Sequence, residues 1–169
     1  MSINFKDKNG FTLVELIFVL FLISLLFTLS LFYFNTSKYK LKKDVYVLYT
    51  NLVKARDYAI RFRKTQKVEF FVNEKKYVLT LFKYNETVQE VYFLSNGVEF
   101  GDGNHSDTSY HTVKFGQGTV ANFSPEGFCM PSGGIYLKTA NSNDNVYKIK
   151  ITLAGDIQIY KWNGSSWIR

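Results

Sequence analysis

Three side chains could act as a nucleophile with its general base: Cys129, His105 and His111. A histidine activates a thiol when the two side chains meet, but nothing in the spacing brings these three together. Both histidines lie in the polar stretch 101–112, which lacks the spacing and the terminal Glu of a calcium-binding loop. The sequence also has no phosphate-binding loop and no nucleophile-elbow motif. We therefore predict no catalytic residue, no metal site and no cofactor, and we expect 101–112 to be a solvated loop. An enzyme remains an alternative only if the cysteine and a histidine share one pocket.

One carboxylate has an unusual setting. Glu15 is the single charged residue in an apolar run of 24 residues that extends from Phe11 to Phe34. A carboxylate costs roughly 2.5–3.5 kcal/mol at the centre of a membrane helix, and less near its end. Glu15 either reaches the membrane edge or pairs with a cation inside an assembly, and its place within the apolar run favours pairing.

The apolar run is long enough to serve as a retained membrane anchor. As a helix it would measure about 36 Å, against a hydrocarbon core of roughly 30 Å. A cleaved secretory signal peptide is the alternative, but its apolar stretch is normally only about 7–15 residues. Lysines flank both ends, and the larger number follows the run, so charge alone would place the C-terminal flank in the cytoplasm. The orientation therefore needs a more specific signal.

The segment Lys8–Glu15, KNGFTLVE, resembles the class III signal sequence of type IV pilins and type II secretion pseudopilins. In that family a short basic leader ends in Gly, a prepilin peptidase cuts after it, and the new N-terminal residue is methylated. The resemblance implies that residues 1–10 are a cleaved leader, that cleavage follows Gly10 and that Phe11 is methylated. It also implies that Glu15 is the carboxylate that sets the register of assembly.

The chemistry of this arrangement supports the resemblance. Cleavage leaves a charged amine on Phe11, and in a fibre this amine can neutralise Glu15 of a neighbouring subunit. Because an unpaired buried carboxylate is costly, such pairing favours one axial register. The resemblance further implies a single-pass protein of the inner membrane with a cytoplasmic N-terminus and a body outside. The implied partners are a prepilin peptidase, other pilin or pseudopilin subunits and, before assembly, membrane lipid.

Helical periodicity continues beyond the apolar run. Apolar residues recur at alternating spacings of four and three, and neither Gly nor Pro interrupts the sequence from Phe11 to Thr65. The pattern predicts one helix, with 11–34 in the membrane and 35–66 outside it, whose apolar stripe packs on a folded body. A free two-stranded coiled coil is the less favoured alternative. The stripe comprises Leu41, Val45, Leu48, Leu52, Ala55, Ala59 and Phe62.

The positive charge of the chain is concentrated on this helix. Ten Lys or Arg and two Asp lie between Lys38 and Lys67, a net charge of +8, whereas the whole chain carries +7. We expect the lysines of 38–43 to meet anionic lipid headgroups. A nucleic-acid contact is a less favoured alternative for the later basic residues. We expect a solvated face comprising Arg56, Arg61, Arg63, Lys64 and Lys67.

From Val68 the apolar period changes to two, which predicts strands. In the most regular case, Tyr147, Ile149, Ile151 and Leu153 alternate with polar residues that include Lys148 and Lys150. The predicted class is α+β, with a long N-terminal helix packed on an antiparallel body of residues 67–169. The expected strands are Val68–Val72, Tyr77–Lys83, Val88–Leu94, Val113–Phe115, Ile135–Thr139, Val146–Leu153 and Ile157–Trp162, with a turn at Asn141–Asn145.

Four segments resemble the GspH/FimT-type minor pseudopilins in order and spacing. They are a helical segment Leu52–Ile60, a strand end Leu94–Val98, a turn Phe123–Gly127 and a closing hairpin Ile149–Ile157. The resemblance implies a β-sandwich-like body of two sheets. It also implies a non-enzymatic minor pseudopilin or minor pilin that assembles into a type II secretion pseudopilus or a type IV pilus.

The C-terminal tail leaves a second function open. Some DNA-binding pilins of this group have a basic tail, and many relatives have Gly-Arg where this chain has Gly155 and Asp156. The acidic residue weakens a role in DNA uptake, although aromatic rings beside cations can stack on bases. We favour an edge strand that presents a surface to a neighbouring subunit. The residues that could contact DNA or a partner are Lys161, Trp162, Trp167 and Arg169.

Overall fold

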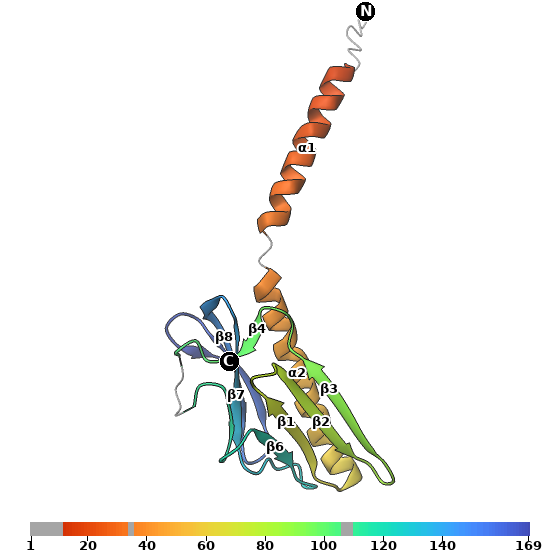
Figure 1. The fold of residues 1–169 in the computed structure, drawn as a ribbon, viewed down its shortest axis with the longest axis vertical. Helices are drawn as coiled ribbons and strands as arrows, with labels where there is room; N and C mark the ends of the chain where they lie inside the picture. The colour runs from red at the N-terminus through yellow and green to blue at the C-terminus, as the bar shows by residue number, and fades with distance from the viewer. Residues whose placement is uncertain (1–11, 34–35, 106–109) are drawn as a thin grey trace, which may run out of the picture. The chain divides into compact units, whose positions relative to one another are not determined.

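The computed structural model describes residues 12–33, 36–105 and 110–169 of the 169-residue chain. The chain divides into two units, one ending at Asn35 and the other extending from Thr36 to Arg169. Helix α1, Leu13–Tyr33, belongs to the first unit, and α2 with all the described strands forms the second, which we call the body (Figure 1). The predicted cleavage residues, Gly10 and Phe11, lie outside the described residues, as does the junction at 34–35. One continuous helix therefore stays a prediction.

Helix α2, Thr36–Phe62, ends four residues earlier than the sequence predicts. Arg63 adopts the left-handed conformation, with a φ of 52°. The N–H of Lys64 donates to the carbonyl of Ala59 at 3.3 Å, which completes a Schellman motif. Glycine usually marks such a helix end, and its absence from 58–65 explains why the pattern appeared to continue.

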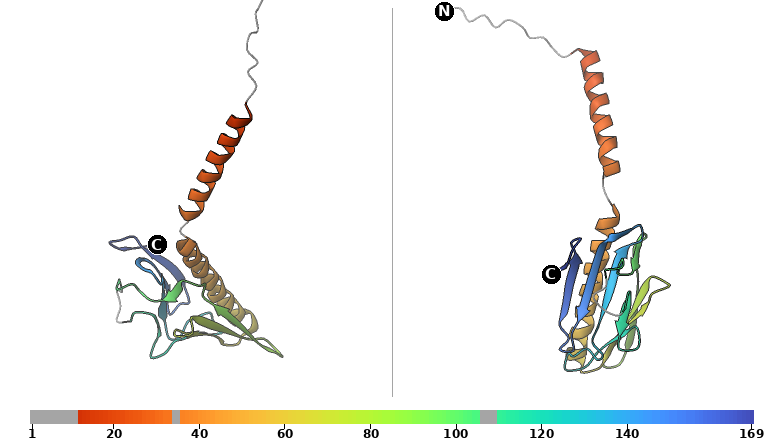
Figure 2. Two further views of the ribbon diagram at one scale, coloured as in Figure 1. Left: turned by 45° about the horizontal axis from the view of Figure 1, so that its top comes forward. Right: turned by 90° about the vertical axis from the view of Figure 1, so that its left-hand side faces the viewer.

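The apolar stripe of α2 is buried from Leu41 to Ala59, as predicted. Its residues from Leu41 to Ala59 are at most 1% exposed, and Phe62 is half-buried. They contact strands of both sheets, so the body itself covers the stripe and a free coiled coil is not needed to bury it. Figure 2 shows α2 running beside the strands in two further views.

The first sheet has four antiparallel strands in the order β3-β2-β1-β6. Its inner side chains alternate with outer ones, most regularly in β2, where every second residue is buried. The strands are β1 Gln66–Phe71, β2 Lys76–Phe82, β3 Thr87–Phe93 and β6 Val120–Phe123.

The second sheet is also antiparallel and has the order β10-β9-β8-β7-β4, with β5 pairing beside β4 on β7. Phe70 of the first sheet joins the two sheets, since its ring lies 6.0 Å from Phe100 and 6.0 Å from Phe115 of the second. The predicted α+β class is confirmed. The strands are β4 Val98–Phe100, β5 Val113–Phe115, β7 Gly133–Thr139, β8 Ser142–Ile151, β9 Ile157–Trp162 and β10 Trp167–Ile168.

Three expectations for the strands are wrong. The turn expected at Asn141–Asn145 is only two residues long, because Ser142 already pairs with Thr139. Lys148, expected on the open face, is 5% exposed, whereas Leu153 is 59% exposed and lies beyond the end of β8. The sequence also did not predict β4, β6 and β10, which are too short to show an alternating pattern.

Candidate functional site

Helix α1 begins where Thr12 and Glu15 close its first turn. A side-chain oxygen of Glu15, Oε2, accepts hydrogen bonds from the Thr12 N–H at 3.1 Å and from the Thr12 hydroxyl at 3.1 Å. In return, the Glu15 N–H donates to Oγ1 of Thr12 at 3.2 Å. This reciprocal pair is a capping box, which satisfies backbone donors that have no partner within the helix. Our sequence reasoning missed Thr12, although the spacing Thr-x-x-Glu before an apolar run is the signal for this motif.

The capping box holds the predicted assembly carboxylate at the start of the helix. An ionised carboxylate has about four acceptor sites, and the two bonds from Thr12 both end on Oε2. Negative charge is also favourable at a helix N-terminus. The carboxylate therefore retains capacity for a cation, and its pairing with the amine of Phe11 stays a prediction.

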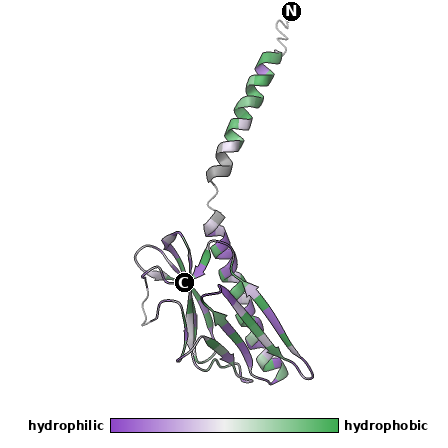
Figure 3. Ribbon diagram, viewed as in Figure 1, coloured by the Kyte–Doolittle hydropathy of each residue, from purple (hydrophilic) through white to green (hydrophobic). Residues whose placement is uncertain are grey.

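Helix α1 has no polar face in its described part. Every side chain from Thr12 to Thr28 is exposed, and nearly all are apolar, as the green ribbon of Figure 3 shows. The hydroxyl groups of Ser24 and Thr28 donate to carbonyls one turn earlier, at 2.8 and 2.7 Å, so they add little polarity to the surface. An exposed helix that is apolar all round must bury its surface in something else. Among the described residues, no helix combines the length and the apolar character that a membrane crossing needs.

In the body, three of the resembling segments meet at Arg56. Its Nε donates to the carbonyl of Gly127 at 3.0 Å, and a terminal nitrogen donates to the carbonyl of Ala154 at 3.2 Å. A Cβ on Gly155, whose φ is +77°, would lie 1.9 Å from the oxygen of Gly127. Helix, turn and closing hairpin are thus held in one contact, which we call the Arg56 contact. The family-like motifs in the body are accordingly structural, and they fix how α2 lies on the strands.

Two further polar contacts hold α2 to the strands. The Asp44 carboxylate is 8% exposed and accepts from the N–H and the hydroxyl of Ser95 at 2.6 and 2.8 Å. Lower on the helix, Asn51 donates to the hydroxyl of Tyr77 at 2.8 Å, and burial raises the pKa of that tyrosine. Because Ser95 belongs to the strand-end segment Leu94–Val98, its bonds to Asp44 also anchor that segment to α2.

A third contact is charged. Lys54 donates to both carboxylate oxygens of Glu90 at 2.6 and 2.8 Å, and the hydroxyl of Tyr92 donates to the same carboxylate at 2.7 Å. The hydrogen bonds from Lys54 and then from Tyr92 hold the pKa of Glu90 below its ordinary value. This group ties α2 to β3, the edge strand of the first sheet.

The basic face of α2 is only partly solvated, which corrects our expectation. Arg56 is half-buried in the contact described above. Lys64 is exposed but donates to the carbonyls of Lys83 and Tyr84 at 2.8 and 3.1 Å. Arg61, Arg63 and Lys67 are exposed, as expected.

The C-terminal hairpin forms an edge of the second sheet, as we predicted for the tail. Trp162 stacks on His105 with ring centres 4.5 Å apart. Trp167 packs 5.7 Å from Tyr136, and its Nε1 donates to the carbonyl of His105 at 3.1 Å. Both indoles are half-buried, so part of their surface is already in use inside the body.

The two cations of the tail lie in different surroundings. Lys161 borders a hollow that is shared with the start of α2, whereas Arg169 borders another hollow beside Arg56 and Asp156. The structure brings Trp162 and Trp167 together, with ring centres 5.5 Å apart, whereas Lys161 and Arg169 border different hollows. A contact of these residues with DNA or with a partner stays a prediction.

The candidate nucleophile and its possible bases have separate partners. Cys129 is buried, its thiol donates to the carbonyl of Pro131 at 3.4 Å, and burial raises its pKa to about 11. Nδ1 of His111 lies 2.6 Å from the carboxylate of Asp102, and His105 stacks on Trp162. A thiol with a raised pKa is a poor nucleophile. Within the described residues, no group of three His, Cys, Asp or Glu could hold a metal ion.

The stretch 101–112 is not simply a solvated loop. Asp102 is 4% exposed. Burial would raise the pKa of its carboxyl, but hydrogen bonds from His111 and from the N–H of Asn104 outweigh burial and hold the pKa below its ordinary value. The two described ends of this stretch are therefore docked on the body, while 106–109 lie outside the described residues.

Comparison with known proteins adds two findings. Residues 5–31 match the prokaryotic N-terminal methylation motif. No curated protein sequence gives a significant match. Because the motif covers only the leader and part of α1, it identifies the N-terminal segment and leaves the body to be compared by structure.

The chain matches solved structures of minor filament subunits. The minor pseudopilin EpsH of the type II secretion system of Vibrio cholerae is 11% identical, with a TM-score of 0.54 over 71% of this chain and 95% of that chain. A second structure of that protein is 13% identical, with a TM-score of 0.52 over 76% and 99% of the two chains. The type IV minor pilin FimU of Pseudomonas aeruginosa is 14% identical, with a TM-score of 0.53 over 79% and 96%. The shared fold and the methylation motif confirm the predicted resemblance to minor pseudopilins and pilins of the GspH/FimT type.

Proposed function

We propose that this chain is a non-enzymatic structural subunit, a minor pseudopilin or minor pilin. A prepilin peptidase removes residues 1–10 and Phe11 becomes methylated. The protein then resides in the inner membrane with its N-terminus in the cytoplasm and its body outside, until other subunits take it into a fibre. The observation that carries this proposal is the methylation motif at residues 5–31, which includes most of the apolar helix α1, in a chain with the fold of minor filament subunits.

In this account α1 is the assembly element and Glu15 sets its register. We expect the capping box to stabilise the carboxylate before assembly, because Thr12 satisfies part of its hydrogen-bonding capacity. In the fibre, the amine of Phe11 of a neighbouring subunit supplies the opposite charge. The body presents its surface to other minor subunits or to cargo, and the fold supports either a type II secretion or a type IV pilus system.

Incorporation into fibres tests this role. A Glu15→Gln variant keeps an acceptor oxygen for the capping box but removes the charge. In cells that make the filament system, we expect Glu15→Gln to be inserted and processed like the wild type but strongly depleted from sheared fibres. Thr28→Val, on the same helix, is the control and should enter fibres normally. Normal incorporation of Glu15→Gln would refute the pairing role.

A DNA-binding minor pilin for DNA uptake is the second candidate. The exposed side chains of Lys161 and Arg169 favour it, whereas the packing of Trp162 and Trp167 inside the body disfavours base stacking. A gel-shift titration of the body with duplex and single-stranded DNA at several salt concentrations tests it. Binding that weakens with salt and with Lys161→Gln would support this function, and the absence of salt-sensitive binding would dismiss it.

A further inference from the structure

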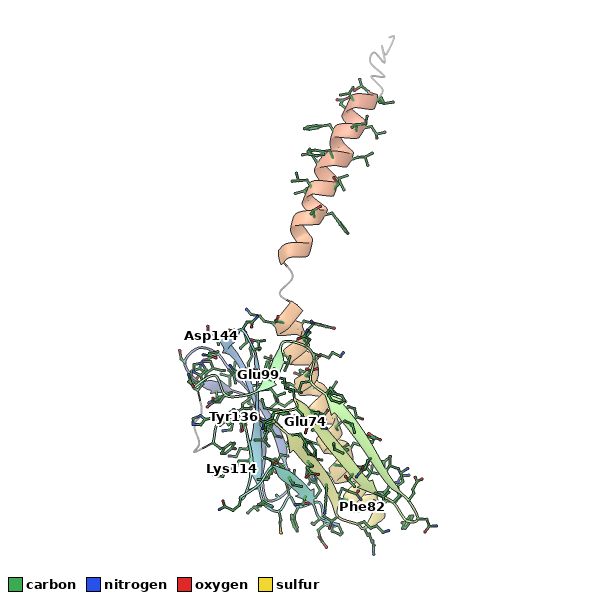
Figure 4. All side chains as sticks on the ribbon, in the orientation of Figure 1. Glu74, Phe82, Glu99, Lys114, Tyr136 and Asp144 are labelled. Atoms are coloured by element: carbon green, nitrogen blue, oxygen red, sulfur yellow. The ribbon has the colours of Figure 1, made fainter. Side chains whose placement is uncertain are left out.

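One end of the body holds three lysines that come from distant parts of the sequence. Lys38 and Lys42 lie on the first two turns of α2, and Lys161 lies on β9. They line one hollow of about 240 Å³ together with Asn145 and Tyr147 of β8. Figure 4 labels Asp144 at this end of the body, and Phe82 marks the opposite end. The fold thus brings three lysines, an asparagine and a tyrosine from distant parts of the sequence around one hollow.

The hollow has a strong excess of positive charge. All three lysines are exposed, and none forms a salt bridge with a carboxylate of the described residues. The carboxylate nearest in sequence to the helical lysines, Asp44, is buried and bonded to Ser95. Asp144, exposed beside Asn145, is not among the described lining residues. The described lining therefore matches an anion with several acceptor oxygens, such as a phosphate diester.

The surroundings of the hollow indicate a lipid rather than a soluble phosphate. Tyr39 is 75% exposed and Tyr46 is 51% exposed on the same part of α2, and Nζ of Lys42 lies 6.0 Å above the ring of Tyr46. Exposed tyrosines beside lysines are typical of the membrane–water interface. Only five positions separate Lys38 from Tyr33, the last residue of the apolar α1.

We propose that this hollow binds the phosphate of an anionic phospholipid headgroup, and we call it the headgroup site. The inference rests on the proposed membrane anchoring, and it adds a lipid class and a set of residues. Because Lys161 belongs to β9, the headgroup would bind the folded body and not merely a basic stretch of helix. Bound lipid would hold the body at an anionic membrane surface until a fibre takes up the subunit.

The isolated body, residues 36–169, can test the site. It contains the whole buried core, from Leu41 to Ile151, so it is expected to fold without α1. It lacks Gly10 and Glu15, so a failure here is distinguishable from a failure of the filament role. Sedimentation with vesicles of equal parts phosphatidylglycerol and phosphatidylcholine should show binding, and vesicles of phosphatidylcholine alone should show little. Equal binding to both kinds of vesicle would overturn the proposal.

Single substitutions locate the binding. A lysine near an anionic surface contributes about 1 kcal/mol, so Lys161→Gln should weaken vesicle binding about fivefold. Lys67→Gln makes the same change of charge on an exposed lysine of β1, outside the described lining of the hollow, and should change binding less than twofold. Equal losses from the two substitutions would show a nonspecific charge effect and overturn the site.

Competition identifies the source of the phosphate. Glycerophosphate or duplex DNA, each added at the phosphate concentration of the vesicles, should displace little of the body. Displacement by glycerophosphate that depends on Lys161 would make the ligand a soluble phosphate. Displacement by DNA with the same dependence would make it nucleic acid. Either result would contradict a lipid site.

Discussion

The first turn of α1 contains a charged side chain, Glu15, within an apolar segment, and Thr12 is its hydrogen-bond partner. The carboxylate is costly in hydrocarbon, but it accepts two hydrogen bonds from Thr12 and lies at the helix end where negative charge is favoured. We therefore expect the same turn to stabilise the carboxylate in the unassembled subunit and to leave an acceptor for the cation of a neighbour. The sequence pointed to Glu15 because it is the only charged residue in the apolar run. Thr12 was missed because the run contains other hydroxyl side chains, and composition alone does not distinguish it.

The capping box gives a prediction at the N-terminus. Thr12→Val removes the hydroxyl and should destabilise the first turn by about 1 kcal/mol, since an N-cap substitution typically costs this much. Hydrogen exchange of the amides of residues 13–16 in detergent should become about fivefold faster. Thr28→Val is the matched control, because its hydroxyl bonds only to the carbonyl of Ser24 and caps nothing. Unchanged exchange in Thr12→Val would show that the box does not hold the turn.

The Arg56 contact gives a second prediction at single residues. Gly155→Ala places a methyl group 1.9 Å from the carbonyl oxygen of Gly127. Because the backbone at Gly127 would have to move, we expect the body to lose at least about 2 kcal/mol in free energy of unfolding. This lies in the upper part of the range for ordinary single substitutions. Gly164→Ala also has a positive φ but meets nothing within 4 Å, so it should cost only about 1 kcal/mol. Urea denaturation measures both, and equal losses would show that strain in φ alone decides the cost.

At the scale of elements, the sequence predicted what depends on periodicity. The stripe of α2 and the longer strands other than β8 were correctly placed because burial on one face repeats at 3.6 or 2 residues. The end of α2 was missed because Arg63 replaces the expected glycine. Lys148 was assigned to the solvent-exposed face because an alternating pattern takes no account of the residues that pack beside the strand in the fold. In the fold its ammonium lies 5.5 Å from the ring of Tyr136 and 5.9 Å from that of Trp167, residues that the sequence did not bring together.

The tie between α2 and β3 predicts a dependence on pH. Hydrogen bonds from Lys54 and Tyr92 lower the pKa of Glu90 in the folded chain from its ordinary value of 4.5. A lowered carboxyl pKa contributes stability that is present above the unfolded value and is lost as the pH falls through the folded value. The body should therefore lose stability as the pH falls below about 4.5, and Lys54→Met should make this loss shallower.

The control for this effect is Lys67→Met, which removes an exposed lysine that forms no salt bridge with a described residue. Thermal unfolding of the three proteins between neutral pH and pH 3 gives the comparison. A curve for Lys54→Met that is parallel to the wild type would show that this pair does not couple α2 to β3.

At the scale of the molecule, the two units differ in what buries their apolar surface. The body buries its own stripe and both sheets, whereas the described part of α1 exposes apolar side chains on every side. Positive charge is concentrated on α2 and the residues just after it, whereas residues 68–169 carry nine basic and ten acidic residues. A body that buries its own core and an apolar helix that does not are what the proposed passage from membrane to fibre would require.

The resemblance to filament subunits could be read from the sequence, because a long apolar run and a methylation motif are local signals. The headgroup site could not, since Lys38 and Lys161 are brought together only by the packing of α2 beside β8 and β9. The Arg56 contact was hidden for the same reason. Its three segments were recognised as motifs, but their meeting at one guanidinium depends on the tertiary fold.

Processing of the N-terminus tests the central claim most directly. The full chain should be expressed in cells with an active prepilin peptidase, isolated from membranes, and examined by N-terminal sequencing and intact mass. The account predicts a chain that begins at a methylated Phe11, and a Gly10→Val variant that remains uncut. A chain that still begins at Met1, in cells whose peptidase processes a known pilin, would contradict the assignment to a filament pathway.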